Sequence, residues 1–431
     1  GGGWGPLPPL DRGYKRVVLM DQRGTGRSSP ITKQTLERNF PSLFALDGVA
    51  SSADAQPNWR DSTASGGRIA EQLDRWESMN PDLAAKVGVG LGQAAEYMAE
   101  FRADSIVRDA EDVKNALLLP TENDKPRPWG AALGQSFGGF CVMTYLSQIP
   151  HPPRVCLLTG GIAPMLTPPK EAYARLWDRV RERNLRYYDR YPGDISLVKK
   201  IVKRLLDKPA KLPARGKLTA RRFLQLGLGL GGSPSAFASM HSLLSSALVN
   251  DGAENGDLEF TRAFLKQIES MQPFDDHPIY FLLHESIYAD SNQPCHCPSD
   301  WAAQSALDDI LASPSAVASG EISPPDFDYA VTCHPSDARP TLFYGEMVFP
   351  WMADGDYAEL SGFGMRALAH SLAAKDDWGP LYDSEAMRRA LAPGGSTRAA
   401  AAVYYDDMYV DFDCSMKLVK RGGPMEGCKV G

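Results

Sequence analysis

The sequence predicts an α/β protein in which a mostly parallel sheet is interrupted by a mainly helical insertion. Two apolar runs of strand length, at 129–135 and 154–162, enclose a helical stretch that ends at a proline. This strand–helix–strand order, with nearly continuous apolar strands, is typical of a parallel sheet with crossover helices. An amphipathic helical pattern then fills 164–334, and strand patterns return at 340–345 and 398–405.

The order of these segments divides the chain into three parts. Residues 1–163 and 335–431 are expected to form the two parts of the α/β core, with residues 164–334 as a helical cap between them. We expect the cap to cover the carboxyl edge of the sheet, because open α/β sheets place their active sites there.

Three further elements are predicted near the N-terminus. The segment KRVVLMD at 15–21 is typical of a short buried strand, and 68–77 has a helical pattern. A longer helix is expected over 99–118, where Ile106 and Val113 fall on one helical face.

Composition excludes several classes of protein. The net charge is −7 without a basic block, which argues against a nucleic-acid surface. No apolar run is long enough to span a membrane, and seven scattered cysteines fit free thiols in a reducing, cytoplasmic compartment. The run Cys295-His296-Cys297 is a weak zinc signal because no second ligand pair follows at metal-site spacing. We interpret it as a solvated loop, and we expect neither a metal nor an organic cofactor.

The motif Gly-Gln-Ser-Phe-Gly-Gly at 134–139 stands between the predicted strand and the following helix. In this context Gly-x-Ser-x-Gly is a nucleophile turn, with Ser136 in a strained conformation above the sheet. Gly134 and Gly138 would let the backbone pass closely, and the Phe137 N–H would donate to an oxyanion. The alternative is a purely structural turn.

A serine of this kind needs a carboxylate and a histidine later in the chain. Asp406 and Asp407 follow the last predicted strand, where the acid of an α/β-hydrolase fold is expected. Its role would be to orient the imidazole and stabilise the protonated form. A pair of loop aspartates that cap a helix is the alternative interpretation.

The chain resembles the proline iminopeptidases, the prolyl aminopeptidases of the α/β-hydrolase fold, from about residue 14 to residue 416. Asp-Gln-Arg-Gly followed by Gly-x-Ser-x-Gly-Gly is far more specific than either motif alone. The resemblance rests on seven segments: DQRGTGRS (21–28), FRADSIVRDAE (101–111), GQSFGGF (134–140), HESIY (284–288), GEMVFPWM (345–352), AAKDDWGPLYD (373–383) and VYYDDMYVDF (403–412).

The resemblance implies release of an N-terminal proline from peptides or amino-acid amides, with Ser136 as nucleophile. It implies that Asp407 is the acid, with Asp406 as the second choice. In such enzymes cap-side glutamates hold the substrate amine, and Glu285 and Glu346 match best. A buried ammonium needs a carboxylate partner, although either glutamate could form an ordinary ion pair instead.

The sequence departs from the family pattern in two places. Only GGGWG stands where a glycine-rich loop would complete the oxyanion hole. All seven histidines precede Asp407, and the 24 residues after it contain none. His370, in a helical stretch, is a weak substitute, and His284 is expected to shape the substrate pocket. We therefore expect a nearly inactive chain with an incomplete C-terminal end, since serine without a base is a poor nucleophile.

Two alternative functions remain open on this evidence. One is a non-catalytic homologue that binds peptides or amines without turnover. The other is an esterase-like hydrolase, because the fold alone does not fix the function. An ester requires no ammonium-binding carboxylate, so the two glutamates separate the esterase from the aminopeptidase.

Overall fold

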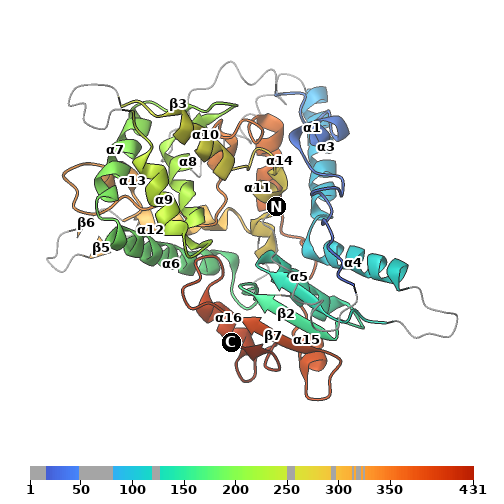
Figure 1. Cartoon of the computed structure of the whole chain (residues 1–431). Helices are drawn as coiled ribbons and strands as arrows, with labels where there is room; N and C mark the ends of the chain where they lie inside the picture. The colour runs from blue at the N-terminus through green and yellow to red at the C-terminus, as the bar shows by residue number, and fades with distance from the viewer. Residues whose placement is uncertain are drawn as a thin grey trace.

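The computed structural model describes residues 16–47, 81–118, 127–249, 258–292, 298–312, 315–316, 322–323 and 326–431. Figure 1 shows an α/β layer at one side of the molecule and a larger group of helices at the other. The predicted helix at 68–77 and the Cys-His-Cys run lie outside the described residues, as does Gly1–Gly5.

The sheet has the strand order β1–β2–β7–β8, and all neighbouring strands are parallel. Its strands are β1 (Ala132–Gln135), β2 (Val155–Thr159), β7 (Arg398–Ala402) and β8 (Lys429–Val430). The predicted parallel sheet and three of its predicted strands are therefore confirmed. Gln135 pairs with Thr159, and Thr159 with Ala402, so the carboxyl ends of three strands meet at one edge.

Helices cover the sheet and connect its strands. The crossover helix α5 (Phe137–Gln148) packs on β1 and β2 and also contacts α4 (Ala103–Leu117) and α15 (Ser384–Leu391). The last helix, α16 (Phe412–Val419), lies beside the C-terminus of the chain (Figure 1). The helix predicted over 99–118 begins at Ala103, because α3 (Pro81–Ala99) ends just before it.

The segment between β2 and β7 is mostly helical, as predicted. Its first helix, α6, begins with Pro169, whose fixed φ suits the first helical position, and buries Tyr173, Trp177 and Val180 on one face. Besides α15, which packs on α5, the described helices and 3-10 turns of this region are α6 (Pro169–Arg190), α7 (Asp194–Asp207), α8 (Ala220–Leu224), η3 (Gln225–Gly231), α9 (Ala236–Ser245), α10 (Arg262–Met271), α11 (Pro278–Leu283), η4 (Glu285–Tyr288), α12 (Ala302–Ala312), α13 (Tyr329–Thr332), η5 (Pro350–Ala353) and α14 (Phe363–Ala373).

Short elements complete the fold. Two small antiparallel pairs, β3 (Ala210–Lys211) with β4 (Lys217–Leu218) and β5 (Ser315–Ala316) with β6 (Ile322–Ser323), lie within the helical region. Helix α1 (Lys33–Asn39) carries a capping box on Thr32, and α3 packs against α14. Figure 1 shows α1 and α3 side by side with α14 next to them.

Two predicted strands are wrong. Residues 16–20 form no strand, and Leu19 is 73% exposed. Residues 341–345 are buried but also form no strand, because helices satisfy their backbone. The Phe343 N–H donates to the side chain of Asn184 at 2.8 Å, and the Asn184 amide donates to the Phe343 carbonyl at 3.0 Å. The side chain of Asn184, on α6, thus forms the hydrogen bonds that a neighbouring strand would otherwise form with Phe343.

Candidate active site

Ser136 occupies the sharp turn between β1 and α5. Its φ of 52° lies in the left-handed region, which a residue with a side chain rarely adopts. The Ser136 N–H donates to the Thr159 carbonyl at 3.0 Å, and its own carbonyl accepts from the Gly139 N–H at 2.8 Å. These two hydrogen bonds hold the N–H and the carbonyl of Ser136 in place. The hydroxyl group is then the part of Ser136 that can change its orientation.

Close packing of backbone on backbone explains the glycines of this turn. A Cβ atom on Gly134 would lie 2.2 Å from the Gly138 carbonyl oxygen, and one on Gly139 would lie 2.2 Å from the Gly161 carbonyl oxygen. A Cβ on Gly138 would meet nothing within 4 Å. The sequence therefore predicts the tight position Gly134 correctly, but the second tight position is Gly139 rather than Gly138.

The backbone N–H of Phe137 belongs to the first residue of α5. Amides of the first helical turn have no acceptor within the helix and carry a partial positive charge. This position is therefore suited to hold an oxyanion formed next to Ser136. The side chain of Phe137 also lines the cavity in front of the serine.

Asp407 lies in the loop that follows β7, close to the end of β2. Its Oδ1 accepts hydrogen bonds from the N–H groups of Tyr409 and Val410, at 2.8 and 3.0 Å. A Cβ atom placed on Gly160, directly after β2, would lie 3.3 Å from Asp407 Oδ2. Burial raises the pKa of the Asp407 carboxyl, although these two hydrogen bonds oppose the shift.

Its neighbour Asp406 has a different environment. The Asp406 carboxylate is about half exposed and pairs with Arg186. This ion pair lowers the pKa of Asp406, so the group is a surface carboxylate. Of the two aspartates, Asp407 is the one held by the backbone next to the strand ends.

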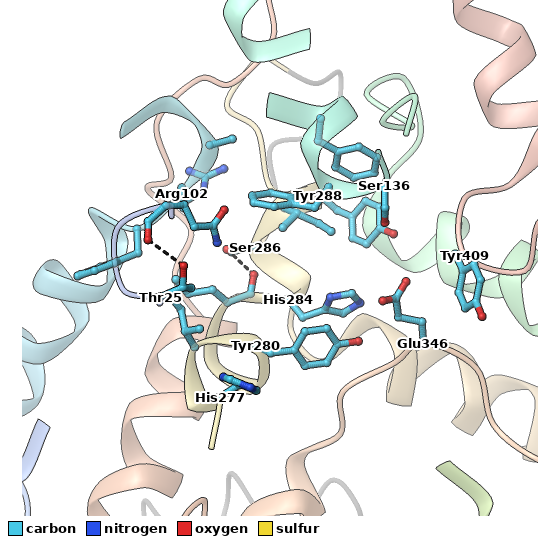
Figure 2. Close-up of a pocket in the computed structure, with 18 of the residues that line it drawn as sticks. Thr25, Arg102, Ser136, His277, Tyr280, His284, Ser286, Tyr288, Glu346 and Tyr409 are labelled. Carbon is cyan, nitrogen blue, oxygen red and sulfur yellow. Dashed lines mark hydrogen bonds between the residues drawn. The ribbon is translucent and has the colours of Figure 1, made fainter. Parts of the chain in front are cut away.

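A cavity of about 450 Å³ opens in front of Ser136, between the sheet edge and the helical region. Figure 2 shows side chains that line it, and they include several tyrosine and histidine rings. The lining includes Ser136, Phe137, Tyr280, His284, Tyr288, Glu346 and Tyr409. The volume lies within the range of about 300–1,000 Å³ that is common for small-molecule sites.

Glu346 brings a carboxyl group into this cavity. Burial and the negative charge of Asp407 raise the pKa of Glu346 to about 7, and the Tyr280 hydroxyl opposes this shift. Figure 2 shows the Glu346 carboxylate directed toward the space between His284, Tyr409 and Ser136. A bound cation would relieve the cost of burying this charge.

Glu285 lies outside the lining of this cavity. It is 4% exposed, and its two oxygens accept from the N–H groups of Ala302 and Ala303 at 2.9 and 3.0 Å. These are the first residues of α12, so the carboxylate holds a helix N-terminus. Burial raises the pKa of Glu285 to about 7. Of the two predicted glutamates, Glu346 therefore lines the cavity and Glu285 does not.

The described histidines form no hydrogen bond with Ser136 or Asp407. His284 lines the cavity and stacks on Tyr280 with ring centroids 4.6 Å apart, and burial lowers its pKa to about 4. His370 accepts from the Trp301 indole N–H at 3.0 Å and lies outside the cavity lining. His241 pairs with Asp194.

Two tyrosines of the cavity wall are evenly spaced on either side of His284, which the sequence predicts to shape the pocket. Tyr280, His284 and Tyr288 are four residues apart, with His284 at the junction of α11 and η4, and all three line the cavity. A polar aromatic residue at every fourth position marks one face of a helix. This spacing predicts that the three side chains lie on the same side of the segment. Tyr409 also lines the cavity, but no sequence pattern around it predicts this position.

The described residues contain no cluster of three or more His, Cys, Asp or Glu side chains that could hold a metal ion. None of the described helices is both long enough and apolar enough to cross a membrane.

Comparison with known proteins identifies the fold family of this chain. Residues 4–241 match the family model of the alpha/beta hydrolase fold. A proline iminopeptidase of Aeromonas sobria is 33% identical over 405 residues, which cover 94% of this chain and 72% of that protein. The proline iminopeptidase AneH of Aspergillus aculeatus is 28% identical over 416 residues, with 94% and 70% covered.

The parallel sheet, the serine turn and the matched family model define an α/β hydrolase. Similarity to the Aeromonas protein extends over nearly the whole chain, from the sheet through the helical region. The chain belongs to the proline iminopeptidase, or prolyl aminopeptidase, family of hydrolases.

Proposed function

We propose that this chain is a serine aminopeptidase that forms a prolyl acyl-enzyme on Ser136. The observation that carries the proposal is a strained serine, at φ 52°, on the same 450 Å³ cavity as the buried carboxyl of Glu346. If the Glu346 carboxylate binds the free ammonium of a peptide, the carbonyl group of the first residue would lie at Ser136. The enzyme would then release a single residue from the amino terminus. Both relatives are named proline iminopeptidases, which supports proline as that residue.

Substrate binding in this proposal depends on Glu346. The secondary ammonium of an N-terminal prolyl residue would pair with the carboxylate, and its ring would pack against Tyr280, Tyr288 and Phe137. Glu285 should contribute little to amine binding, because both of its oxygens are engaged by α12.

The chemical steps are acylation and hydrolysis. Ser136 Oγ would attack the prolyl carbonyl, and the Phe137 N–H would donate to the oxyanion. The amine of the following residue leaves with a proton, and water then releases proline. A base must take the Ser136 proton and deliver it to the leaving amine, and Asp407 would orient that base.

We propose that residues 1–431 alone turn over prolyl substrates slowly, because no described histidine is hydrogen-bonded to Ser136. Loss of the histidine from a serine protease lowers turnover by about 10⁶-fold. The seven histidines of the chain all precede Asp407, in contrast to the serine–acid–histidine order of the fold. Free imidazole that diffuses to Asp407 would then supply the missing proton transfer.

The test is hydrolysis of L-prolyl-naphthylamide with and without imidazole. We expect a rate close to background that rises with imidazole concentration, and no such rise in Ser136→Ala. A fast, imidazole-independent rate that disappears in Ser136→Ala would show that another group serves as base. A rate that persists in Ser136→Ala would contradict the assignment of the nucleophile. Hydrolysis of acetyl esters in preference to the prolyl amide would favour the esterase alternative.

A further inference from the structure

The wall of the cavity contains a second polar side chain next to Glu346. His284 directly follows α11, whereas Glu346 lies in the stretch before η5. Each of the two residues keeps partial exposure, although the residues directly before and after it in the chain are buried. Both side chains line the cavity, so the surface that they keep faces it (Figure 2). The proposed reaction uses Glu346 but gives His284 no part.

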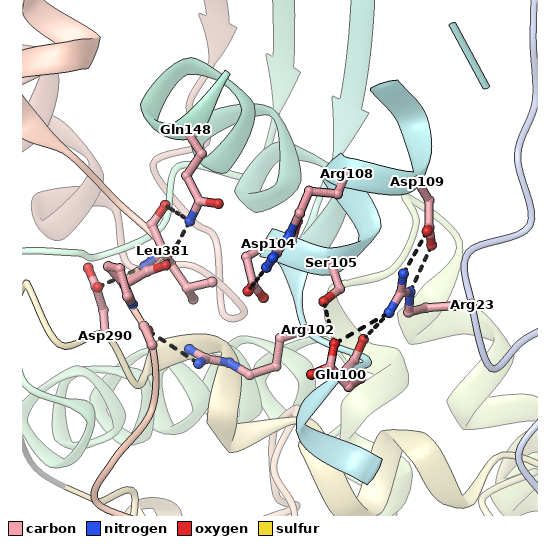
Figure 3. Close-up of polar contacts among 12 residues, drawn as sticks. Arg23, Glu100, Arg102, Asp104, Ser105, Arg108, Asp109, Gln148, Asp290 and Leu381 are labelled. Carbon is pink, nitrogen blue, oxygen red and sulfur yellow. Dashed lines mark hydrogen bonds and ion pairs between the residues drawn. The ribbon is translucent and has the colours of Figure 1, made fainter. Parts of the chain in front are cut away.

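Several other polar side chains of this lining already have partners within the protein. The hydroxyl groups of Thr25, Ser286 and Tyr409 donate to backbone carbonyl groups at 2.9, 2.7 and 2.7 Å. Arg102 donates to two backbone carbonyl groups and belongs to the internal polar contacts drawn in Figure 3. The fold itself therefore accounts for these groups, and it leaves His284 and Glu346 to be explained.

The imidazole of His284 is a neutral hydrogen-bonding group. It stacks on Tyr280 with ring centroids 4.6 Å apart, and burial lowers its pKa to about 4, although the backbone of Glu346 opposes this shift. A neutral imidazole has one nitrogen that donates and one that accepts. A backbone group that favours the protonated ring is one to which the ring donates, so the other nitrogen is the acceptor.

The ring of His284 and the carboxylate of Glu346 face the same part of the cavity (Figure 2). They form neither a hydrogen bond nor an ion pair with each other, and no cation of the described residues pairs with Glu346. Burial and the charge of Asp407 raise the pKa of Glu346 instead. A positively charged group with two N–H donors would bridge the carboxylate and the ring and relieve the cost of burying both.

We infer that His284 accepts the second N–H of the prolyl ammonium and so positions the amine beside the Glu346 carboxylate. The inference rests on the proposed function, in which Glu346 binds this ammonium. An N-terminal proline carries two N–H donors, whereas every other N-terminal residue carries three. One charged and one neutral acceptor match the two donors of proline. A neutral ring also avoids the repulsion that a protonated histidine would exert on a bound cation.

The test is titration calorimetry of L-prolinamide binding to the Ser136→Ala chain at pH 8, which removes turnover. His284→Phe keeps a ring that can stack on Tyr280 but removes the nitrogen, and we expect it to weaken binding by roughly tenfold. His284→Gln removes the ring but keeps an acceptor, so it should bind more tightly than His284→Phe. If His284 served only to pack the cavity wall, the order of these two variants would be reversed. The reversed order would overturn the inference.

His370→Phe is the matched control for this substitution. Burial lowers the pKa of His370 to about 4 as well, but its ring accepts from the Trp301 indole outside the cavity lining. We expect this variant to keep its affinity for prolinamide within about twofold. A loss as large as that of His284→Phe would show that the effect of His284 is not local, which would contradict the inference.

Nitrogen-15 NMR of the histidine-labelled Ser136→Ala chain tests the contact without a change at His284. Addition of prolinamide should shift the signal of one unprotonated ring nitrogen, and the loss of that signal in His284→Gln assigns it. An unshifted His284 signal at saturating prolinamide would overturn the inference.

The effect of Glu346→Gln separates the inference from the proposed function. If Glu346→Gln weakens binding and His284→Phe does not, the inference fails while the proposed function stands. If prolinamide does not bind, or if Glu346→Gln leaves its affinity unchanged, the proposed function fails and the inference fails with it.

Discussion

At the carboxyl edge of the sheet, backbone conformation and backbone contacts determine the candidate site. In the helical layer, the packing of side chains determines it. Ser136 owes its position to a left-handed turn and to glycines that touch neighbouring carbonyl groups. Glu346 owes its position to the packing of segments far apart in the sequence, since Tyr280 and Tyr409 line the same cavity. The comparison shows that the turn of the proposed nucleophile is encoded locally, while the carboxyl group proposed to bind the substrate amine depends on tertiary packing.

The largest effects are expected at the backbone contacts of the turn. Gly134→Ala and Gly139→Ala each force a methyl group against a carbonyl oxygen, so we expect a loss of about 3 kcal/mol or more in the free energy of unfolding. Gly138→Ala meets open space and should be neutral or slightly stabilising, since alanine is the better helix former. Urea denaturation of the three variants measures the difference. Equal losses at all three positions would contradict the packing account.

The next effect separates the two predicted glutamates. Glu346→Gln should weaken the binding of prolinamide by about 10- to 100-fold, because a charge-assisted hydrogen bond to the ammonium is lost. Glu285→Gln, an equally conservative change at a carboxylate outside the cavity lining, should leave this affinity within about twofold. Titration calorimetry at pH 8 measures both. The account would be wrong if Glu285→Gln had the larger effect.

The pH dependence sharpens this contrast. Because the pKa of Glu346 is raised to about 7, its carboxyl group is mostly neutral at pH 5 and mostly ionised at pH 8. Affinity for prolinamide should therefore rise with pH up to about 7 and then level off. The rise should be absent in Glu346→Gln. A pH-independent affinity in the unmodified chain would indicate that Glu346 does not hold the ammonium.

Glu285 should affect stability rather than binding. Its pKa is raised from 4.5 to about 7, so the folded chain holds more protons than the unfolded chain between these values. The contribution of Glu285 to the free energy of unfolding should thus fall by about 2 kcal/mol as pH rises from 5 to 7. Glu285→Gln should remove that part of the slope. The comparison requires urea titrations at several pH values, and parallel slopes in both chains would refute it.

The smallest effect is expected at the segment 16–20, where a buried strand is absent. Leu19→Ser should change the free energy of unfolding by less than about 0.5 kcal/mol, because the side chain is 73% exposed. Val107→Ser, in the buried face of α4, is the matched change in a packed position and should cost several times more. A large loss with Leu19→Ser would show that this segment is packed after all.

The sequence predicts much of the sheet edge because its signals are local. A glycine-bracketed serine between a strand and a helix requires the observed turn, and Asp407 follows the last predicted core strand. Burial of the strands is less regular, since Leu133 and Leu157 pair in register and both are exposed. Short apolar runs such as 340–345 cannot be assigned from periodicity alone, because a buried irregular segment has the same composition.

The helical half of the site was less predictable for a physical reason. Glu285 and Glu346 look alike in sequence, but folding brings the first amides of α12 to Glu285 and places Glu346 on the cavity beside Tyr280. No local pattern around these residues distinguishes a substrate contact from a structural one.

The central claim, a nucleophilic Ser136 without an imidazole partner in the described chain, is tested most directly by trapping the acyl-enzyme. An activated L-proline nitrophenyl ester needs little help from a base to acylate a serine, whereas deacylation by water does need that help. Mass spectrometry of the chain after brief exposure should therefore show one added prolyl group that accumulates on the peptide containing Ser136. It should be absent from Ser136→Ala. An unmodified Ser136, or a prolyl group attached elsewhere, would contradict the account.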